Sequence, residues 1–121
     1  MRHHNVTEDT RDGILAVLNT YGSDRAQQGK PEKAAQYAQA VHAVEAGALE
    51  VRVEHSVYRV VGEQRLARFV TVEAARGQVL AELRGFSDKQ TGRGYAEAAT
   101  AVEHGALAVW ADGTMYRVVE G

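Results

Sequence analysis

Residues 106–119, ALAVWADGTMYRVV, alternate apolar and polar side chains on both sides of Asp112-Gly113. This pair favours a two-residue type I′ turn, and the alternation is typical of a half-buried strand, so the segment predicts a β-hairpin. The turn would place Trp110 opposite Met115. Since neighbouring side chains of a strand point to opposite faces, these two residues are expected on the face turned away from the helices.

The same pattern occurs once more, inside an internal repeat. Residues 37–61 align with residues 95–119 without a gap, and 14 of the 25 aligned positions are identical. Upstream, 14–24 resembles 79–88, so the repeat is expected to cover most of the chain. The helix-covered face of the two hairpins is then predicted to carry Leu49, Val51, Tyr58 and Val60 in the first copy and Leu107, Val109, Tyr116 and Val118 in the second.

Two helices are expected ahead of each hairpin, from apolar residues at helical spacing. In the first helix of each copy these residues are Ile14, Leu15, Leu18 and Tyr21, and Val72, Ala75, Val79, Leu83 and Phe86. Thr7 and Thr71 are the predicted N-caps, because acidic residues follow each of them. Gly22-Ser23-Asp24 and Ser87-Asp88 are expected to end the first helices, and Pro31 to begin the second helix of the first copy.

The predicted fold is α+β, a tandem internal duplication of an ααββ unit with its helices packed on one face of an antiparallel sheet. Gly47 and Gly105 end the second helices, where glycine can adopt the left-handed conformation of a C-cap. We expect one compact domain of two units, 1–61 and 62–121, with a flexible arm over 1–12 and a linker over 62–70. The hairpins are expected to pair with each other or across a homodimer, since a lone hairpin is marginal in water.

Composition and charge exclude several classes of protein. The chain has 121 residues and no cysteine, which rules out disulfides and cysteine-ligated zinc. No stretch approaches the roughly 18 apolar residues of a membrane span, and the start, MRHHNVTEDT, lacks the apolar region of a signal peptide, so a cytoplasmic protein is expected. The net charge of −2, without a basic block, argues against nucleic acid as the favoured partner.

The sequence contains only weak candidates for catalytic or cofactor-binding motifs. Apart from the adjacent pair His3-His4, none of the five histidines lies at metal-ligand spacing from another. Thr91-Gly92-Arg93-Gly94 resembles a phosphate-binding loop, but a simple connecting loop explains it better. The sequence therefore predicts neither an enzyme nor a bound metal or cofactor.

The outer face of the hairpins is the candidate site, with Trp110, Met115 and Arg117 at its centre and Arg52 and Arg59 at its edge. Tryptophan, methionine and arginine are enriched in the cores of protein interfaces, which indicates a partner-binding surface. Two plainer interpretations stay open. Leu66, Phe69 or the N-terminal arm could cover Trp110 within the chain, and Arg59 could simply pair across the strands with Glu50.

The function predicted on this basis is that of a small interaction protein, an inhibitor, adaptor or regulatory subunit, that binds a protein partner or a second copy of itself. The alternative is a winged-helix-like nucleic-acid-binding regulator, because two helices followed by a hairpin also fit that architecture. The second helix of the first copy contains one lysine and no arginine, which disfavours a role in reading DNA.

Overall fold

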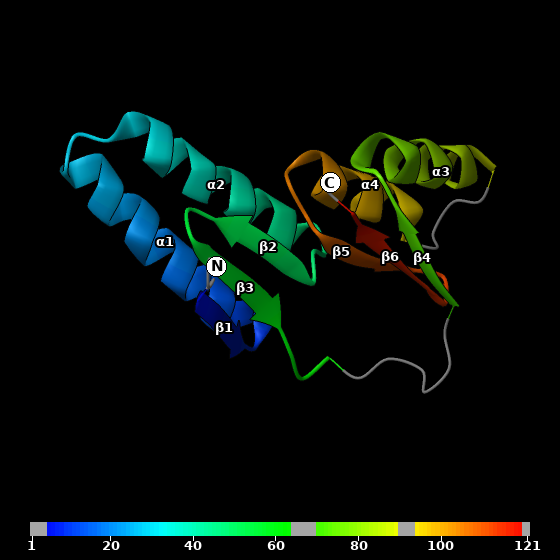
Figure 1. The fold of residues 1–121 in the computed structure, drawn as a ribbon, viewed down its shortest axis with the longest axis horizontal. Coiled ribbons are helices and arrows are strands. Elements are labelled where there is room, and N and C mark those ends of the chain that lie inside the picture. Colours follow the sequence, from blue (N-terminus) through cyan, green and yellow to red (C-terminus); the bar gives the residue numbers. More distant parts are fainter. Residues whose placement is uncertain (1–4, 64–69, 90–93, 120–121) are drawn as a thin grey trace.

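The computed structural model describes residues 5–63, 70–89 and 94–119, and these residues form four helices and one six-stranded mixed sheet (Figure 1). The α+β class predicted from the sequence is confirmed. In chain order the elements are β1 (Asn5–Asp9), α1 (Arg11–Gln27), α2 (Pro31–Glu45), β2 (Glu50–Val53), β3 (Ser56–Val60), β4 (Val70–Ala74), α3 (Arg76–Lys89), α4 (Tyr95–Glu103), β5 (Ala108–Ala111) and β6 (Thr114–Val118).

The strand order across the sheet is β1-β3-β2-β5-β6-β4. The two hairpins, β2-β3 and β5-β6, are antiparallel, and they join in the centre through a short antiparallel contact at Glu50 and Ala108. The expectation that the hairpins pair with each other within the chain is therefore confirmed. The outer strands β1 and β4 run parallel to β3 and β6, so the prediction of a purely antiparallel sheet was wrong.

Each half of the chain thus contains one strand more than the predicted ααββ unit. Thr7 and Thr71 lie in β1 and β4 and cap no helix, which corrects their assignment as N-caps. Val72, predicted in the first helix of the second copy, also lies in β4. The cap of α1 is Thr10, whose side chain accepts a hydrogen bond from the amide of Gly13 at 3.2 Å. Part of the segment expected to be a flexible arm, 1–12, is accordingly strand and helix.

The predicted hairpin register is found in the structure. Trp110 lies opposite Met115, and the turn residues Asp112 and Gly113 both have positive φ, at 47° and 81°, as a type I′ turn requires. In the first hairpin the turn begins at Glu54, whose φ is 57°. A residue other than glycine in this conformation is strained, so its side chain is expected to make compensating contacts.

All four described helices pack on the same face of the sheet, and the core lies between the two layers (Figure 1). Corresponding residues of the two halves fill it: Ile14, Leu18, Tyr37, Val44, Val51, Tyr58 and Val60, and Val79, Leu83, Tyr95, Val102, Val109, Tyr116 and Val118. Leu49 and Leu107, also predicted for this face, are only half-buried. They lie at the seam between the hairpins, where their amides donate to Ala108 and Glu50.

The helices continue through the residues that were expected to end them. Gly22 lies inside α1, and Ser87-Asp88 lie inside α3. The sequence suggested a helix end at Gly22, but the residue serves close packing, since a Cβ added there would lie 3.1 Å from the Cβ of Tyr37 in α2. Tyr21 and Phe86, predicted on the buried stripes, are exposed at 41% and 37%.

The C-termini of α2 and α4 end in the same way. Gly47 and Gly105 have φ values of 116° and 105°, which confirms the predicted left-handed caps. The amide of Gly47 donates to Val44 and that of Ala48 to Ala43, the two hydrogen bonds of a Schellman motif, and the end of α4 contains both corresponding bonds. An arginine at the start of the preceding helix then donates to two carbonyls of each end: Arg11 to Val44 and Ala48, and Arg76 to Val102 and Ala106.

Candidate protein-binding face

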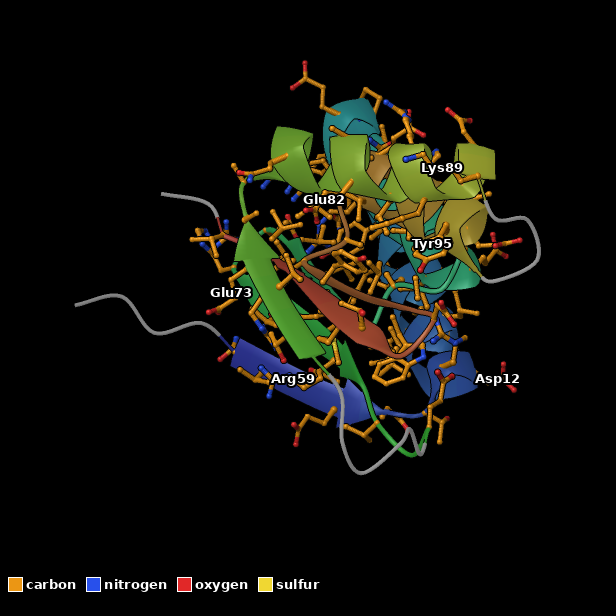
Figure 2. The ribbon with its side chains drawn as sticks, turned by 90° about the vertical axis from the view of Figure 1, so that its right-hand side faces the viewer. Asp12, Arg59, Glu73, Glu82, Lys89 and Tyr95 are labelled. Carbon is orange, nitrogen blue, oxygen red and sulfur yellow. The ribbon has the colours of Figure 1, made fainter. Side chains whose placement is uncertain are left out.

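The face of the sheet opposite the helices, here called the outer face, carries side chains that alternate with the buried ones along each strand. It is formed by Val6, Glu8, Glu50, Arg52, Val57, Arg59, Val61, Thr71, Glu73, Ala108, Trp110, Met115, Arg117 and Val119. Figure 2 shows the sheet from its side, with Arg59 and Glu73 labelled on two of its strands. All five residues predicted for the site, Trp110, Met115, Arg117, Arg52 and Arg59, belong to this face.

Glu50 brings two of the predicted arginines together at the centre of the sheet. Its carboxylate accepts a hydrogen bond from Nε of Arg59 at 3.1 Å, and Nη1 of Arg117 lies 3.8 Å from its other oxygen. The Glu50 side chain is only 12% exposed, because it lies at the seam where β2 meets β5. The pairing of Arg59 with Glu50 that the sequence left open is therefore present.

Arg59 also reaches the neighbouring edge strand, where its Nη1 lies 3.1 Å from the carboxylate of Glu8. Hydrogen bonds to Glu50 first and Glu8 second raise the pKa of the Arg59 guanidinium above its ordinary value. A depression of about 200 Å³ lies at the seam between the hairpins. Glu50, Arg59, Arg117 and Met115 line it. Its rim can present guanidinium groups and a thioether to a partner.

Trp110 and Met115 form the registered pair that the sequence predicted, and both side chains are half-buried. Trp110 makes further interactions of its own within the chain. Leu66 and Phe69, the residues proposed as an intramolecular cover, lie outside the described residues. Within the N-terminal segment proposed as another cover, Asn5–Asp9 form β1 at the edge of the sheet beside β3.

Three of the large apolar side chains that the structure leaves exposed belong to the outer face. Val6 is 52% exposed, Val61 39% and Val119 51%. Val61 and Val119 follow β3 and β6 at corresponding positions, and each donates its amide to the end of the neighbouring parallel strand. The outer face therefore combines exposed valines with paired charges, whereas the opposite face is covered by helices.

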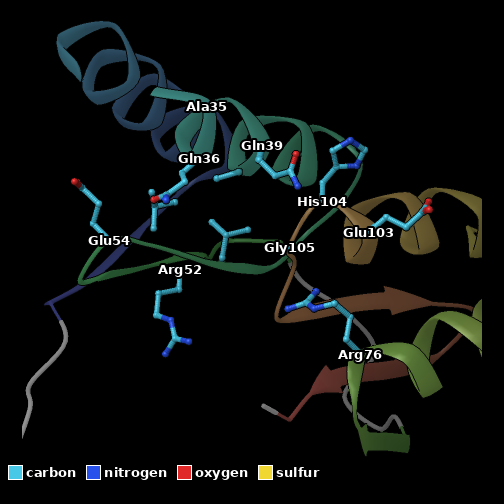
Figure 3. A pocket seen from close by; sticks show the side chains of 12 residues that line it. Ala35, Gln36, Gln39, Arg52, Glu54, Arg76, Glu103, His104 and Gly105 are labelled. Carbon is cyan, nitrogen blue, oxygen red and sulfur yellow. The ribbon is translucent and has the colours of Figure 1, made fainter. Parts of the chain in front are cut away.

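Arg52 lies apart from this centre. It pairs with Val57 across the first hairpin and lines a larger cleft of about 560 Å³ between the two halves of the chain (Figure 3). Figure 3 shows Gln36 and Gln39 of α2 on one side of this cleft, and Glu103, His104 and Arg76 of the second half on the other. Glu103 is paired with Arg84, which does not line the cleft.

The first hairpin turn is held by a cluster that sequence reasoning missed. The hydroxyl of Tyr37 donates to the carboxylate of Glu54, which also contacts Arg25 at 3.1 Å and Lys33 at 3.3 Å. The hydrogen bond from Tyr37, followed by that from Arg25, lowers the pKa of Glu54 from 4.5 to about 2. Burial, followed by the bond to Glu54, raises the pKa of Tyr37.

The second hairpin has a corresponding contact, in which the hydroxyl of Tyr95 donates to the carboxylate of Asp112 at 3.2 Å. The signal was present in the alignment, since Tyr37 matches Tyr95 and Glu54 matches Asp112. The role of Glu50 was harder to predict from the sequence. Its aligned residue is Ala108, and Arg117 approaches it only because the two hairpins pair through β2 and β5.

Comparisons of the chain with protein-family models, with curated proteins and with solved structures found no match. Among the residues that the structure describes, no helix is long and apolar enough to cross a membrane. The same residues contain no group of three or more histidine, aspartate or glutamate side chains placed to hold a metal ion. Function must therefore be inferred from the surfaces described above.

Proposed function

We propose that this protein is a small non-enzymatic interaction protein, an inhibitor, adaptor or regulatory subunit, that binds a protein partner through the outer face of its sheet. The observation that carries the proposal is the exposure of Val6, Val61 and Val119 on a face that none of the described helices covers. Apolar side chains left exposed on a sheet face that the helices do not cover support an interaction surface there. In keeping with the sequence, we take its place of action to be the cytoplasm.

The chemistry of the centre supports the same proposal. The side chain of Met115 is flexible and that of Trp110 is a flat ring, and both offer apolar surface to a partner. Interface cores are enriched in methionine, tryptophan and arginine. The guanidinium groups of Arg59 and Arg117 lie at the rim of the central depression, with side chains 43% exposed. A partner that brings a carboxylate could share these arginines with Glu50 and keep its charge paired.

We further infer that the two halves arose by tandem duplication. Both follow the order strand, helix, helix, strand, strand, and both contain the Schellman end, the arginine that contacts it and the tyrosine at the hairpin turn. The duplication is informative for function because it supplies a comparison within the chain. Where Trp110 stands in the second half, the first half has Arg52, so the scaffold accepts either residue there.

Trp110→Arg is therefore the variant that tests the proposal. It installs the residue of the matching position, so the melting temperature should stay within about 3 °C of the parent. Capture of partner proteins from the host lysate, or self-association measured by light scattering, should weaken at least tenfold, since a tryptophan anchor contributes roughly 2 kcal/mol or more. Phe86→Arg, at an exposed apolar position of α3 outside the outer face, serves as the matched control and should leave capture unchanged. An unfolded Trp110→Arg protein, or one with unaltered partners and mass, would show that the tryptophan is only part of the core.

The alternative predicted from the sequence, a winged-helix-like nucleic-acid-binding regulator, stays a prediction. The lysine of the candidate recognition helix, Lys33, lies 3.3 Å from Glu54 and is thus already paired with a carboxylate. A heparin column at low salt separates the two functions, because phosphate-directed binding requires a basic surface. Retention that falls steeply with salt would favour the alternative.

A further inference from the structure

Two imidazoles from different halves of the chain meet where α2 and α4 come together. His42 lies in the last turn of α2 and His104 is the C-cap residue of α4. Their ring centroids are 5.5 Å apart, and the ring planes are inclined at 51°. Sequence reasoning did not indicate this pair, because the two histidines are distant along the chain and only the packing of α2 against α4 brings them together.

The hydrogen bonding of His104 determines which of its nitrogens can bind a ligand. Its Nδ1 lies 2.8 Å from the carbonyl oxygen of Thr100, which can only accept a hydrogen bond. In the neutral ring Nδ1 therefore carries the proton, and Nε2 presents a lone pair. Histidines that ligate metals commonly donate their other N–H to a backbone carbonyl in this way.

His42 has a related environment. Its Nδ1 faces the carboxylate of Glu45 at 3.8 Å, which favours the proton on that nitrogen and leaves Nε2 as the lone-pair site. The His42 side chain is 64% exposed, so an ion from solvent can reach it. Both rings also lie at the C-terminal end of a helix, where the helix dipole favours positive charge.

The separation of the rings fits a shared ion. Two imidazoles on a tetrahedral zinc ion, with Zn–N distances of about 2.0–2.1 Å, have ring centroids roughly 5 Å apart. The observed 5.5 Å is close to this value. No larger cluster of metal-binding side chains occurs in the part of the chain that the structure describes, so water is expected to complete the coordination.

We propose that His42 and His104 bind one divalent ion of the zinc, nickel or copper class through their Nε2 atoms. The choice of ion follows from the imidazole ligands, which suit these metals and disfavour calcium or magnesium. An ion held by both rings links α2 of the first half to α4 of the second. Because the unfolded chain holds the two rings apart, binding stabilises the folded state.

The internal alignment supplies the variants for the test. Position 42 corresponds to Thr100 and position 104 to Ala46, so His42→Thr and His104→Ala install residues that the other half already uses at these places. The background for every protein is a chain in which His3 and His4 are replaced by glutamine, since this adjacent pair could bind metal by itself. His55→Gln, which removes an exposed histidine of a hairpin turn, is the matched control.

Zinc chloride and nickel chloride alone are the probes, in thermal melts and in titration calorimetry at pH 7.5. The background protein and the His55→Gln control should melt several degrees higher with excess metal and bind one ion per chain. His42→Thr and His104→Ala should each lose the melting shift and at least tenfold in affinity. Binding should weaken at pH 5.5, because a ligating imidazole must be unprotonated. No shift in the background protein, or a shift that both single variants retain, would overturn the proposal.

Discussion

The cluster at the first hairpin turn gives a prediction whose size can be worked out from the structure. Glu54 accepts from Tyr37 and contacts Arg25 and Lys33, and these contacts lower its pKa from 4.5 to about 2. If the whole lowering of the Glu54 pKa contributed to stability, it would add roughly 3 kcal/mol to the free energy of unfolding at neutral pH. Lys33 is 50% exposed, so solvent screening reduces the expected contribution to about 1–2 kcal/mol.

The variant is Glu54→Gln, which keeps the length of the side chain and leaves the same cost of positive φ at the turn. At pH 7 we expect a loss of about 1–2 kcal/mol in the free energy of unfolding, measured by urea denaturation. The stabilisation by ionised Glu54 is present above pH 4.5, where the group is charged in the folded and the unfolded chain. It is lost as the pH falls from 4.5 towards 2, so the difference between parent and variant should narrow below pH 4.

Asp112→Asn is the matched control for this experiment. Its carboxylate accepts from the hydroxyl of Tyr95 at the corresponding turn, at 3.2 Å, so the variant measures the loss of the same tyrosine–carboxylate contact in the second hairpin. A difference between parent and Glu54→Gln that stayed constant from pH 7 to pH 3 would refute the account of the carboxylate's charge.

Two further predictions concern the ends of α2 and α4. Gly47→Val and Gly105→Val should each lower the free energy of unfolding by about 1 kcal/mol or more, because valine is strained at positive φ, and melts that match the parent would disprove the cap. Arg76→Met should cost about 2 kcal/mol, because it removes charged hydrogen bonds at 2.7 and 2.9 Å to the carbonyls of Val102 and Ala106. Urea denaturation measures that loss, and a change below about 0.5 kcal/mol would contradict the structural role of this arginine.

The hairpins and their helix ends could be predicted from the sequence because local residues determine them. Asp112-Gly113 fixes the turn, the alternation of side chains fixes the faces, and Gly47 and Gly105 mark the left-handed positions. These features act over a few residues. The strand alternation and the glycine ends occur twice, so the alignment reinforces them, whereas the Asp-Gly turn occurs only in the second hairpin. The outer face followed from the same local rules.

Strands β1 and β4 could not be predicted in the same way. Asn5–Asp9 is short and largely exposed, and it becomes a strand only by parallel pairing with β3, far along the chain. Its Thr and acidic residues resemble the start of a helix, which explains the false N-cap at Thr7. Parallel strands are not joined by a short turn, so no local sequence motif identifies the strand with which an edge strand such as β1 pairs.

The same distinction applies to the candidate site. The contact of Arg59 with Glu50 follows from the register of one hairpin and was expected as an alternative. The approach of Arg117 to Glu50 depends on the contact between β2 and β5, and the meeting of His42 with His104 on the packing of α2 against α4. Such contacts between distant segments leave no periodic signal in the sequence.

The central claim is that the outer face of the sheet binds a protein partner, and charge introduced on that face tests it most directly. Val61→Glu combined with Val119→Glu places two carboxylates among exposed apolar side chains, while Phe86→Glu does the same at an exposed apolar position on α3. Each protein is compared with the parent by light scattering and by quantitative capture from the host lysate, after its melt confirms that it is folded. The account predicts that the double variant loses its partner or its self-association while Phe86→Glu retains it. Equal retention by both variants, or equal loss, would contradict the assignment of this face.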